Sequence, residues 1–483
     1  MAERITARQA IAAVVGEDAS VGGDTPAGEG AMDGEGAPAG AGALAGAGGA
    51  FTELPVPEGE SVPDGPLGWE GYDVVRARAQ DRTGEQESVV CGTGRIGATE
   101  VVLISFEFGF LGGSLGERTG DRLEAAYSLA RERRLPVVSL IATGGSRMQE
   151  GMRALLQLQR VARQSALTRA AGLPQFAVVR DPTTGGGWAT LGAGADVVLA
   201  LPGAQIGFAG SRVRPADADP YAYTAEAQLA AGHIDAVVPP GELRATAGRW
   251  LTLLTGGGAG AQDAVPPPAP PPAALGRGEL PATGWDAVVR ARSPERPRAE
   301  AYLDAYFTER EAIVGDRCGG TDPGMLCGFG RHDGRTVAYA AQCGTPTLPS
   351  GYRTAARLIR LAGRLGIPVL TLVDTPGAAN DAEAERRGAG AAIADLFAAV
   401  ATAPVPLTTL LIGEGGSGGA LALSAPDNTW ATPDSYFSVI APELATAILK
   451  RSPDRTRATA DQLRLRPQDL VSLGVVRGIV PPG

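Results

Sequence analysis

The sequence predicts an α/β protein that contains two copies of one structural unit. Short runs rich in Val, Ile and Leu alternate with longer segments whose apolar residues have helical spacing. The same pattern of prolines and glycines then occurs a second time, shifted by 232 positions: from Pro136 to Pro368, and from Pro174 to Pro406. This repeat, without insertions, indicates an internal duplication.

In the first copy, residues 135–145 (LPVVSLIATGG) predict a buried strand that enters a glycine turn. The next segment has apolar residues at helical spacing and ends at Gly172, where glycine is favoured as a helix stop. Residues 173–181 (LPQFAVVRD) predict the following strand.

The second copy repeats this order of elements. The strand IPVLTLVDTPG is followed by a helix through AGAAIADLFAAVA and by the strand VPLTTLLIGEGG. Four turn positions of the first copy match four of the second: Thr143, Gly145, Gly186 and Gly187 with Thr375, Gly377, Gly418 and Gly419.

Composition divides the chain into four parts. Residues 1–65 are acidic and rich in Ala, Gly and Pro, a composition that favours disorder. Residues 66–254 form the first predicted domain. Residues 255–283 contain PPPAPPP and predict a semi-rigid linker, and residues 284–483 form the second domain.

The totals exclude several classes of function. A net charge of −10 with scattered arginines does not favour nucleic-acid binding. The chain has only two histidines, His233 and His332, and neither lies beside a nucleophile signature, so a Ser–His–Asp or Cys–His mechanism is disfavoured. No apolar run is long enough for a membrane span, and we expect a cytoplasmic protein.

The glycine clusters are the candidate catalytic feature. A strand that passes through Gly-Gly directly into a helix leaves backbone N–H groups without partners, and glycine lets a ligand oxygen approach them. Glycine can also serve only to permit a tight turn. No GxxxxGK[ST] phosphate loop is present. The recurrence of two such junctions in each copy favours two oxyanion holes, with amides near Gly145, Ser146, Gly186, Gly187, Gly377, Ala378, Gly418 and Gly419.

Long motifs resemble a known family. In the first half, FEFGFLGGSLGERTGDR, TGGSRMQEG and DPTTGGGWAT are similar to the β subunit of the bacterial acetyl-CoA carboxylase carboxyltransferase. In the second half, ARSPERPRAEAYLDAYF, PSGYRTAARLIRLAGRLGIPVLTLVDTPGA and IGEGGSGGALAL are similar to its α subunit. The resemblance covers most of the chain outside the tail and linker.

The resemblance implies a crotonase-like ββα superhelix in each half. It also implies transfer of a carboxyl group from carboxybiotin, on a biotin carboxyl carrier protein loaded by a biotin carboxylase, to the α-carbon of an acyl-CoA thioester. The first hole would hold the thioester enolate oxygen and the second the biotin ureido oxygen. The expected cofactor-binding residues are Gly113, Ser114, Gly116, Arg147, Gly415 and Gly416.

Further expectations follow from the family. Its sites lie between a β-like and an α-like half, which implies a head-to-tail homodimer. No cysteine precedes Cys91, so we expect no zinc ribbon and no metal. The expected substrate is a small acyl-CoA or acyl-carrier thioester. Two alternatives to this transferase remain open: a biotin-independent decarboxylase of a malonyl-type thioester or related β-carbonyl acid on the same scaffold, and a non-catalytic subunit for carboxylase assembly.

Overall fold

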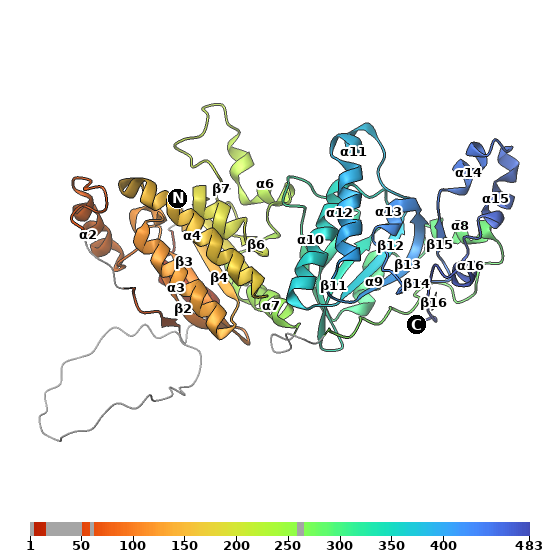
Figure 1. The fold of residues 1–483 in the computed structure, drawn as a ribbon, viewed down its shortest axis with the longest axis horizontal. Helices are drawn as coiled ribbons and strands as arrows, with labels where there is room; N and C mark the ends of the chain where they lie inside the picture. Colours follow the sequence, from red (N-terminus) through yellow and green to blue (C-terminus); the bar gives the residue numbers. More distant parts are fainter. Residues whose placement is uncertain (1–3, 16–50, 58–61, 258–264) are drawn as a thin grey trace, which may run out of the picture.

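The structure is a computed structural model that describes residues 4–15, 51–57, 62–257 and 265–483. Two α/β halves lie side by side along the long axis of the molecule (Figure 1). Each half has one eight-stranded sheet. None of the described helices is long and apolar enough to cross a bilayer.

The first sheet has the order β1-β2-β3-β4-β5-β6-β8, with β7 paired to β5. The pairs β1–β2 and β2–β3 are antiparallel, and the other pairs are parallel. The strands are β1 Thr52–Glu53, β2 Val89–Ile96, β3 Thr99–Phe106, β4 Val137–Thr143, β5 Gln175–Thr184, β6 Val197–Ala200, β7 Ile206–Gly207 and β8 Ala236–Val237. The α-helices are α1 Ala7–Val15, α2 Tyr72–Thr83, α3 Glu117–Arg133, α4 Gly151–Ala170, α5 Gly185–Gly187, α6 Ala225–Ala230 and α7 Leu243–Thr255.

The second sheet has the order β16-β14-β13-β12-β11-β10-β9, with β15 paired to β13. The strands are β9 Glu309–Ile313, β10 Met325–His332, β11 Arg335–Gln342, β12 Val369–Thr375, β13 Leu407–Gly416, β14 Thr429–Ala431, β15 Tyr436–Ser438 and β16 Gly478–Ile479. The helices are α8 Gly284–Arg292, α9 Ala299–Tyr306, α10 Pro349–Leu365, α11 Ala382–Arg386, α12 Ala389–Ala401, α13 Ser417–Leu421, α14 Pro442–Ile448, α15 Thr456–Gln462 and α16 Pro467–Ser472.

The two halves repeat one another element by element. Helices α3 and α10 both have 17 residues and begin 232 positions apart, at Glu117 and Pro349. Strands β4 and β12 have the same offset, as do β5 and β13. The internal duplication predicted from the prolines and glycines is therefore present in the fold.

Each sheet is covered by helices on both faces. In the first half, α3 and α4 pack on one face, and α1 and α7 pack on the other. In the second half, α10 and α12 cover one face and α9 covers the other. The α1 and α7 layer continues into the α10 and α12 layer, and Trp250 of α7 meets Phe329 of β10 edge to face at 6.3 Å between ring centroids. One hydrophobic core therefore joins the halves.

Two low-complexity segments are more ordered than the sequence predicts. In the tail that we expected to be disordered, residues 7–15 form α1, and Ala7, Ile11 and Val14 are buried in the core. The same tail contributes β1, which pairs with β2. The rest of that prediction, residues 16–50 above all, lies outside the described residues. The described part of the proline segment packs on the second half through the buried Ala269 and Ala274. Apolar contacts with residues distant in sequence offset the ordering entropy of these segments.

A buried carboxylate fixes the contact between the halves. Asp235, at the amino end of β8, forms ion pairs with Arg317 at 2.5 Å and Arg357 at 3.3 Å. It also accepts hydrogen bonds from the N–H groups of Val198 and Val314. Burial alone would raise the pKa of Asp235, but the two guanidinium groups and the two amides outweigh it and lower this pKa.

Replacing Ile11 with Ala should lower the free energy of unfolding by about 2–4 kcal/mol, because the change leaves a cavity between α1 and the first sheet. Urea unfolding followed by tryptophan fluorescence measures this. Ala12, on the exposed side of α1, supplies the matched control: Ala12→Ser should change stability by less than about 0.5 kcal/mol. Equal stabilities of the two variants would contradict the docking of α1.

Asp235→Asn should cost about 3–5 kcal/mol of stability, because it leaves two partly buried arginines without their fully buried carboxylate. The pKa of Asp235 is lower in the folded chain than in the unfolded chain. Its stabilising contribution is therefore complete above about pH 4 and is lost as the pH falls further. Acid titration of stability should show this loss in the wild type and not in the variant.

Candidate active site

The glycine junctions lie where two neighbouring strands of each sheet end. Thr143 closes β4 and Thr183 lies beside it in β5, so the turns that follow meet at one edge of the first sheet. A Cβ built on Gly185 would be only 3.1 Å from the Cα of Gly145. The second half has the same arrangement, with Thr375 of β12 paired to Gly415 of β13. In each half the structure therefore brings the two predicted junctions together.

The peptide that follows Gly145 has a fixed orientation. Its carbonyl accepts a hydrogen bond of 2.9 Å from the N–H of Leu115, and the N–H of Arg147 donates to the carbonyl of Leu115 at 2.9 Å. The C=O and N–H of a trans peptide point in opposite directions. Since the C=O of Gly145 points toward Leu115, the N–H of Ser146 points away from it. Among the described residues this N–H meets no acceptor.

The second half fixes the matching peptide in the same way. The N–H of Thr347 donates to the carbonyl of Gly377 at 3.1 Å, and the N–H of Ala379 donates to the carbonyl of Thr347 at 2.9 Å. The N–H of Ala378 therefore points away from Thr347, as the N–H of Ser146 points away from Leu115. It too has no acceptor in the described part of the chain.

Two of the predicted donors are already occupied. The N–H of Gly145 donates to the hydroxyl of Thr143 at 3.1 Å, and the N–H of Gly377 donates to the hydroxyl of Thr375 at 3.1 Å. This corrects the sequence prediction, because an amide with a good internal partner is not free for a ligand. Gly145 and Gly377 instead provide unusual backbone angles, with φ of +106° and +141°. The hydroxyls of Thr143 and Thr375 orient the turns, a role that sequence reasoning missed although both threonines recur at the duplication offset.

The second junction of each half contributes further free amides. No acceptor among the described residues meets the N–H groups of Gly186, Gly187, Gly418 or Gly419. Gly185 and Ser417, which precede these pairs, have nearly equal φ values of +63° and +59°. The two junctions differ in their surroundings: Gly186 lies under the side chain of Leu158, whereas Gly418 is exposed and a Cβ there would meet nothing within 4 Å.

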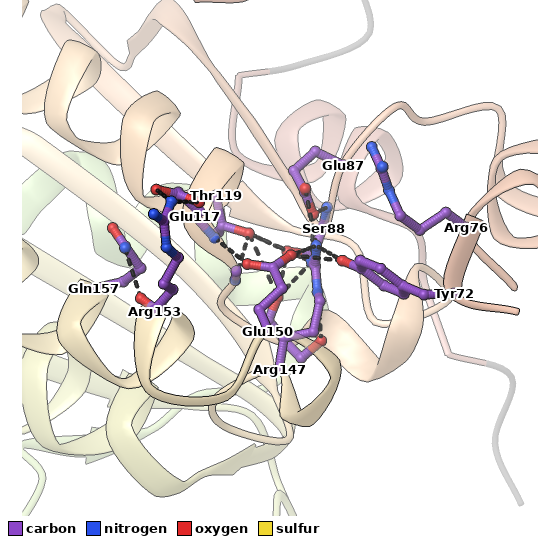
Figure 2. Close-up of polar contacts among 12 residues, drawn as sticks. Tyr72, Arg76, Glu87, Ser88, Glu117, Thr119, Arg147, Glu150, Arg153 and Gln157 are labelled. Atoms are coloured by element: carbon purple, nitrogen blue, oxygen red, sulfur yellow. Dashed lines mark hydrogen bonds and ion pairs between the residues drawn. The ribbon is translucent and has the colours of Figure 1, made fainter. Parts of the chain in front are cut away.

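The structure contradicts the expectation that Arg147 borders a ligand. Its side chain is 1% exposed, and its guanidinium faces Glu87 and Glu150 (Figure 2). Ser114 is also buried, and it accepts hydrogen bonds from Arg147 through its hydroxyl and its carbonyl. The positive charge of Arg147, which we expected to face a ligand, is therefore paired with carboxylates inside the protein.

The predicted cofactor-binding glycines have packing roles in the structure. A Cβ on Gly113 would lie 2.1 Å from the carbonyl of Ala142, and one on Gly116 would lie 2.5 Å from Glu150. In β13, a Cβ on Gly415 would meet the ring of Phe437 at 2.8 Å, and one on Gly416 would meet the carbonyl of Pro376 at 2.0 Å. These four residues permit close approach of neighbouring segments, and any contact with a cofactor stays a prediction.

Both histidines lie away from the glycine junctions. His332 stacks on Tyr306 at 3.7 Å and lies opposite Arg335, where β11 begins, so it is at the amino edge of the parallel strands. His233 precedes β8, and its ring Nδ1 pairs with Gln228. Burial and the nearby Arg317 lower the pKa of His233. In the described residues, no group of three His, Cys, Asp or Glu side chains could hold a metal ion.

Exposed apolar side chains border both junctions. Met148 follows Ser146 by two residues and is 77% exposed. Phe208, whose carbonyl accepts from the N–H of Gly185, is 74% exposed, and Val439, next to the strand beside Gly416, is 73% exposed. Exposed apolar residues that stand singly are ordinary on a protein surface. Sequence reasoning gave no role to these residues.

Comparison with known proteins shows which family this chain is similar to. A carboxyl transferase domain family matches residues 70–238, and an acetyl co-enzyme A carboxylase carboxyltransferase-like family matches residues 281–482. The acetyl-coenzyme A carboxylase carboxyl transferase subunits beta/alpha of Saccharopolyspora erythraea are 39% identical over 429 residues, covering 85% of this chain and 74% of the relative. Those of Salinispora arenicola are 39% identical and cover 90% of this chain and 80% of the relative. The chain belongs to this carboxyltransferase family.

Solved structures give the fold of this carboxyltransferase. Transcarboxylase 12S, a hexamer solved with methylmalonyl-coenzyme A and methylmalonic acid bound, matches with a TM-score of 0.75 and 20% identity, over 99% of this chain and 87% of that chain. A single-chain, multi-domain long-chain acyl-CoA carboxylase matches with a TM-score of 0.70 and 19% identity, over 99% of this chain and 46% of that chain. The prediction of two crotonase-like domains is confirmed.

Gly187→Ala should lower the free energy of unfolding by about 1–3 kcal/mol, because its Cβ would lie 2.3 Å from the methyl group of Thr143. Gly418→Ala is the matched control, since nothing lies within 4 Å of its Cβ and its stability should be unchanged. Denaturant titration of both variants measures the difference. A stable Gly187→Ala variant would show that the two junctions are packed less closely than described.

Proposed function

We propose that this carboxyltransferase moves a carboxyl group from carboxybiotin to the α-carbon of a short acyl-CoA thioester. The observation that carries the proposal is a set of three backbone N–H groups in each half that meet no acceptor among the described residues: those of Ser146, Gly186 and Gly187, and those of Ala378, Gly418 and Gly419. Preorganised N–H donors of this kind stabilise negative charge that develops on a carbonyl oxygen. In a reaction that develops negative charge on two carbonyl oxygens, each half would stabilise one of them.

The proposed reaction needs no histidine in the site. The carboxyl group leaves a biotin nitrogen, the α-proton of the thioester moves to the ureido group, and the α-carbon forms a bond to the carboxyl carbon. Negative charge develops on the thioester oxygen and on the ureido oxygen during these steps. The amides at Ser146, Gly186 and Gly187 would stabilise the first charge, and those at Ala378, Gly418 and Gly419 the second.

A second copy of the chain would complete each site. The first half contacts its own second half through Leu173, Asp196 and Asp235, which lie at the amino ends of β5, β6 and β8. The free amides lie at the carboxyl ends of β4 and β5, and the ten residues of β5 separate these edges by roughly 30 Å. The first-half site therefore faces away from its own second half. This supports a head-to-tail homodimer, with Met148, Phe208 and Val439 near the contact.

The remaining partners follow from this function. Carboxybiotin reaches the site on a biotin carboxyl carrier protein, which a biotin carboxylase loads, and the working location is the cytoplasm. A decarboxylase would need only the first-half amides. The second half keeps the same peptide geometry, with Thr347 and Ala378 in place of Leu115 and Ser146, which favours transfer over decarboxylation.

The wild-type protein should transfer the carboxyl group of malonyl-CoA to biocytin, a soluble biotin derivative, and form acetyl-CoA only when biocytin is present. Gly418→Leu should keep the fold, because the space around its Cβ is open, and should lower turnover by about 10²- to 10³-fold by filling the approach to the second-half amides. Chromatography of the CoA products measures both results, and circular dichroism checks the fold.

Three outcomes would oppose the proposal. Release of carbon dioxide at the same rate without biocytin would indicate a decarboxylase. Full turnover by a folded Gly418→Leu protein would show that the second-half amides take no part in the reaction. Sedimentation of the wild type as a monomer with full activity would contradict a site shared between two copies.

A further inference from the structure

A buried arginine lies next to the first-half amide. Arg147 follows Ser146 directly, and its side chain is 1% exposed although it carries a full charge. Its guanidinium contacts Glu87, two residues before β2, and lies 3.2 Å from both Glu150 and the hydroxyl of Tyr72 of α2 (Figure 2). Burying a charge is costly unless it is paired, so this cluster needs all its members.

Arg147 also holds the segment that orients Ser146. One guanidinium nitrogen donates to the carbonyl of Ser114 at 2.8 Å, and another donates to its hydroxyl at 3.2 Å. The backbone N–H of Arg147 donates to the carbonyl of Leu115 at 2.9 Å. Leu115 is the residue whose own N–H holds the carbonyl of Gly145. Arg147 therefore binds both Ser114 and Leu115, the segment whose hydrogen bond to Gly145 sets the direction of the Ser146 N–H.

Glu87 and Glu150, the two carboxylates that pair with Arg147, connect it to other elements of the first half. Glu150 accepts a hydrogen bond from Tyr72 at 2.5 Å and another from the backbone N–H of Glu117, at the start of α3, at 2.5 Å. Burial alone would raise the pKa of Glu87, but Arg147 outweighs this and holds the pKa below its usual range. The cluster thus connects α2, β2, α3 and the turn after β4 around a single guanidinium group (Figure 2).

The second half lacks this device. Ala379 occupies the position that matches Arg147, and its N–H still donates to Thr347. The segment before α10 is held instead by Asp322, whose carboxylate accepts from the N–H groups of Leu348 and Gly324 at 2.8 Å. The duplication therefore kept the peptide geometry but changed the residues that hold the preceding segment: an arginine in the first half and an aspartate in the second.

We propose that Arg147 is a positioning residue for the thioester side of the reaction, acting through Ser114 and Leu115 to hold the Ser146 N–H on the developing negative charge. The inference rests on the proposed function. Arg147 itself touches no substrate, since its side chain is enclosed. Its loss should therefore affect the rate of reaction and not the binding of the thioester.

Steady-state kinetics of carboxyl transfer from malonyl-CoA to biocytin tests this with Arg147→Met and Arg147→Lys in the full-length protein. Arg147→Met should lower kcat per folded enzyme by about 10²-fold, with the KM for malonyl-CoA changed by less than about 3-fold, because a small misplacement of a catalytic donor acts on the transition state. Arg147→Lys keeps the charge but cannot reach Glu87 and Ser114 together, so it should recover about 10-fold of the loss. Circular dichroism gives the folded fraction.

Arg133→Met is the matched control, since Arg133 pairs with Glu100 on the surface at the far end of α3 and should leave kcat within 2-fold of wild type. If Arg147→Met does not fold, the kcat and KM of Arg147→Lys alone test the positioning role. A folded variant with wild-type kcat, or one in which only the KM rises, would overturn the positioning role. Absence of biocytin-dependent transfer by the wild type would refute the proposed function itself, whatever Arg147 does.

Discussion

The hydrogen bond between the N–H of Leu115 and the C=O of Gly145, with its counterpart between Thr347 and Gly377, is the constraint on which both amide sites depend. A peptide plane has only one freedom that matters here, its rotation about the chain direction. Once a neighbouring segment holds the carbonyl, the next N–H must point the other way. The hydroxyls of Thr143 and Thr375 remove the adjacent amides from use, so each turn offers its donor in one direction.

The fold supplies the rest of the geometry by placing these turns where neighbouring parallel strands end. The halves join at the amino ends of β5, β6 and β8, around Asp235, and not at these turns. The proposed homodimer would bring the surface of a second copy to these turns. The exposed Met148 and Phe208 beside the first-half amides agree with a protein or ligand at that position. Because the halves of one chain contact each other at the amino ends of the strands, the turns that carry the first-half amides do not face the second half of the same chain.

The two copies show how a duplicated unit diverges. Both copies retain the peptide bridge, which orients the N–H of Ser146 in one and of Ala378 in the other. The residues that support the bridge have changed: Arg147 with two carboxylates in one copy, Asp322 in the other. Ligands of different charge and size require different surroundings. Support residues can change as long as the bridge keeps its geometry, whereas a side chain at Gly187 or Gly419 would collide with the turn itself.

The sequence alone determined the duplication, the strand–helix–strand order in each copy, and the positions of the four glycine junctions, because periodicity and turn residues are local properties of the chain. Only the tertiary structure decided which amides are free. The residues that orient the Ser146 and Ala378 peptides, Leu115 and Thr347, lie about thirty residues away along the chain. It also buried Arg147, which sequence reasoning had assigned to a ligand, and it ordered α1 within a tail of low complexity. Burial and pairing depend on contacts between distant segments, and no local pattern records them.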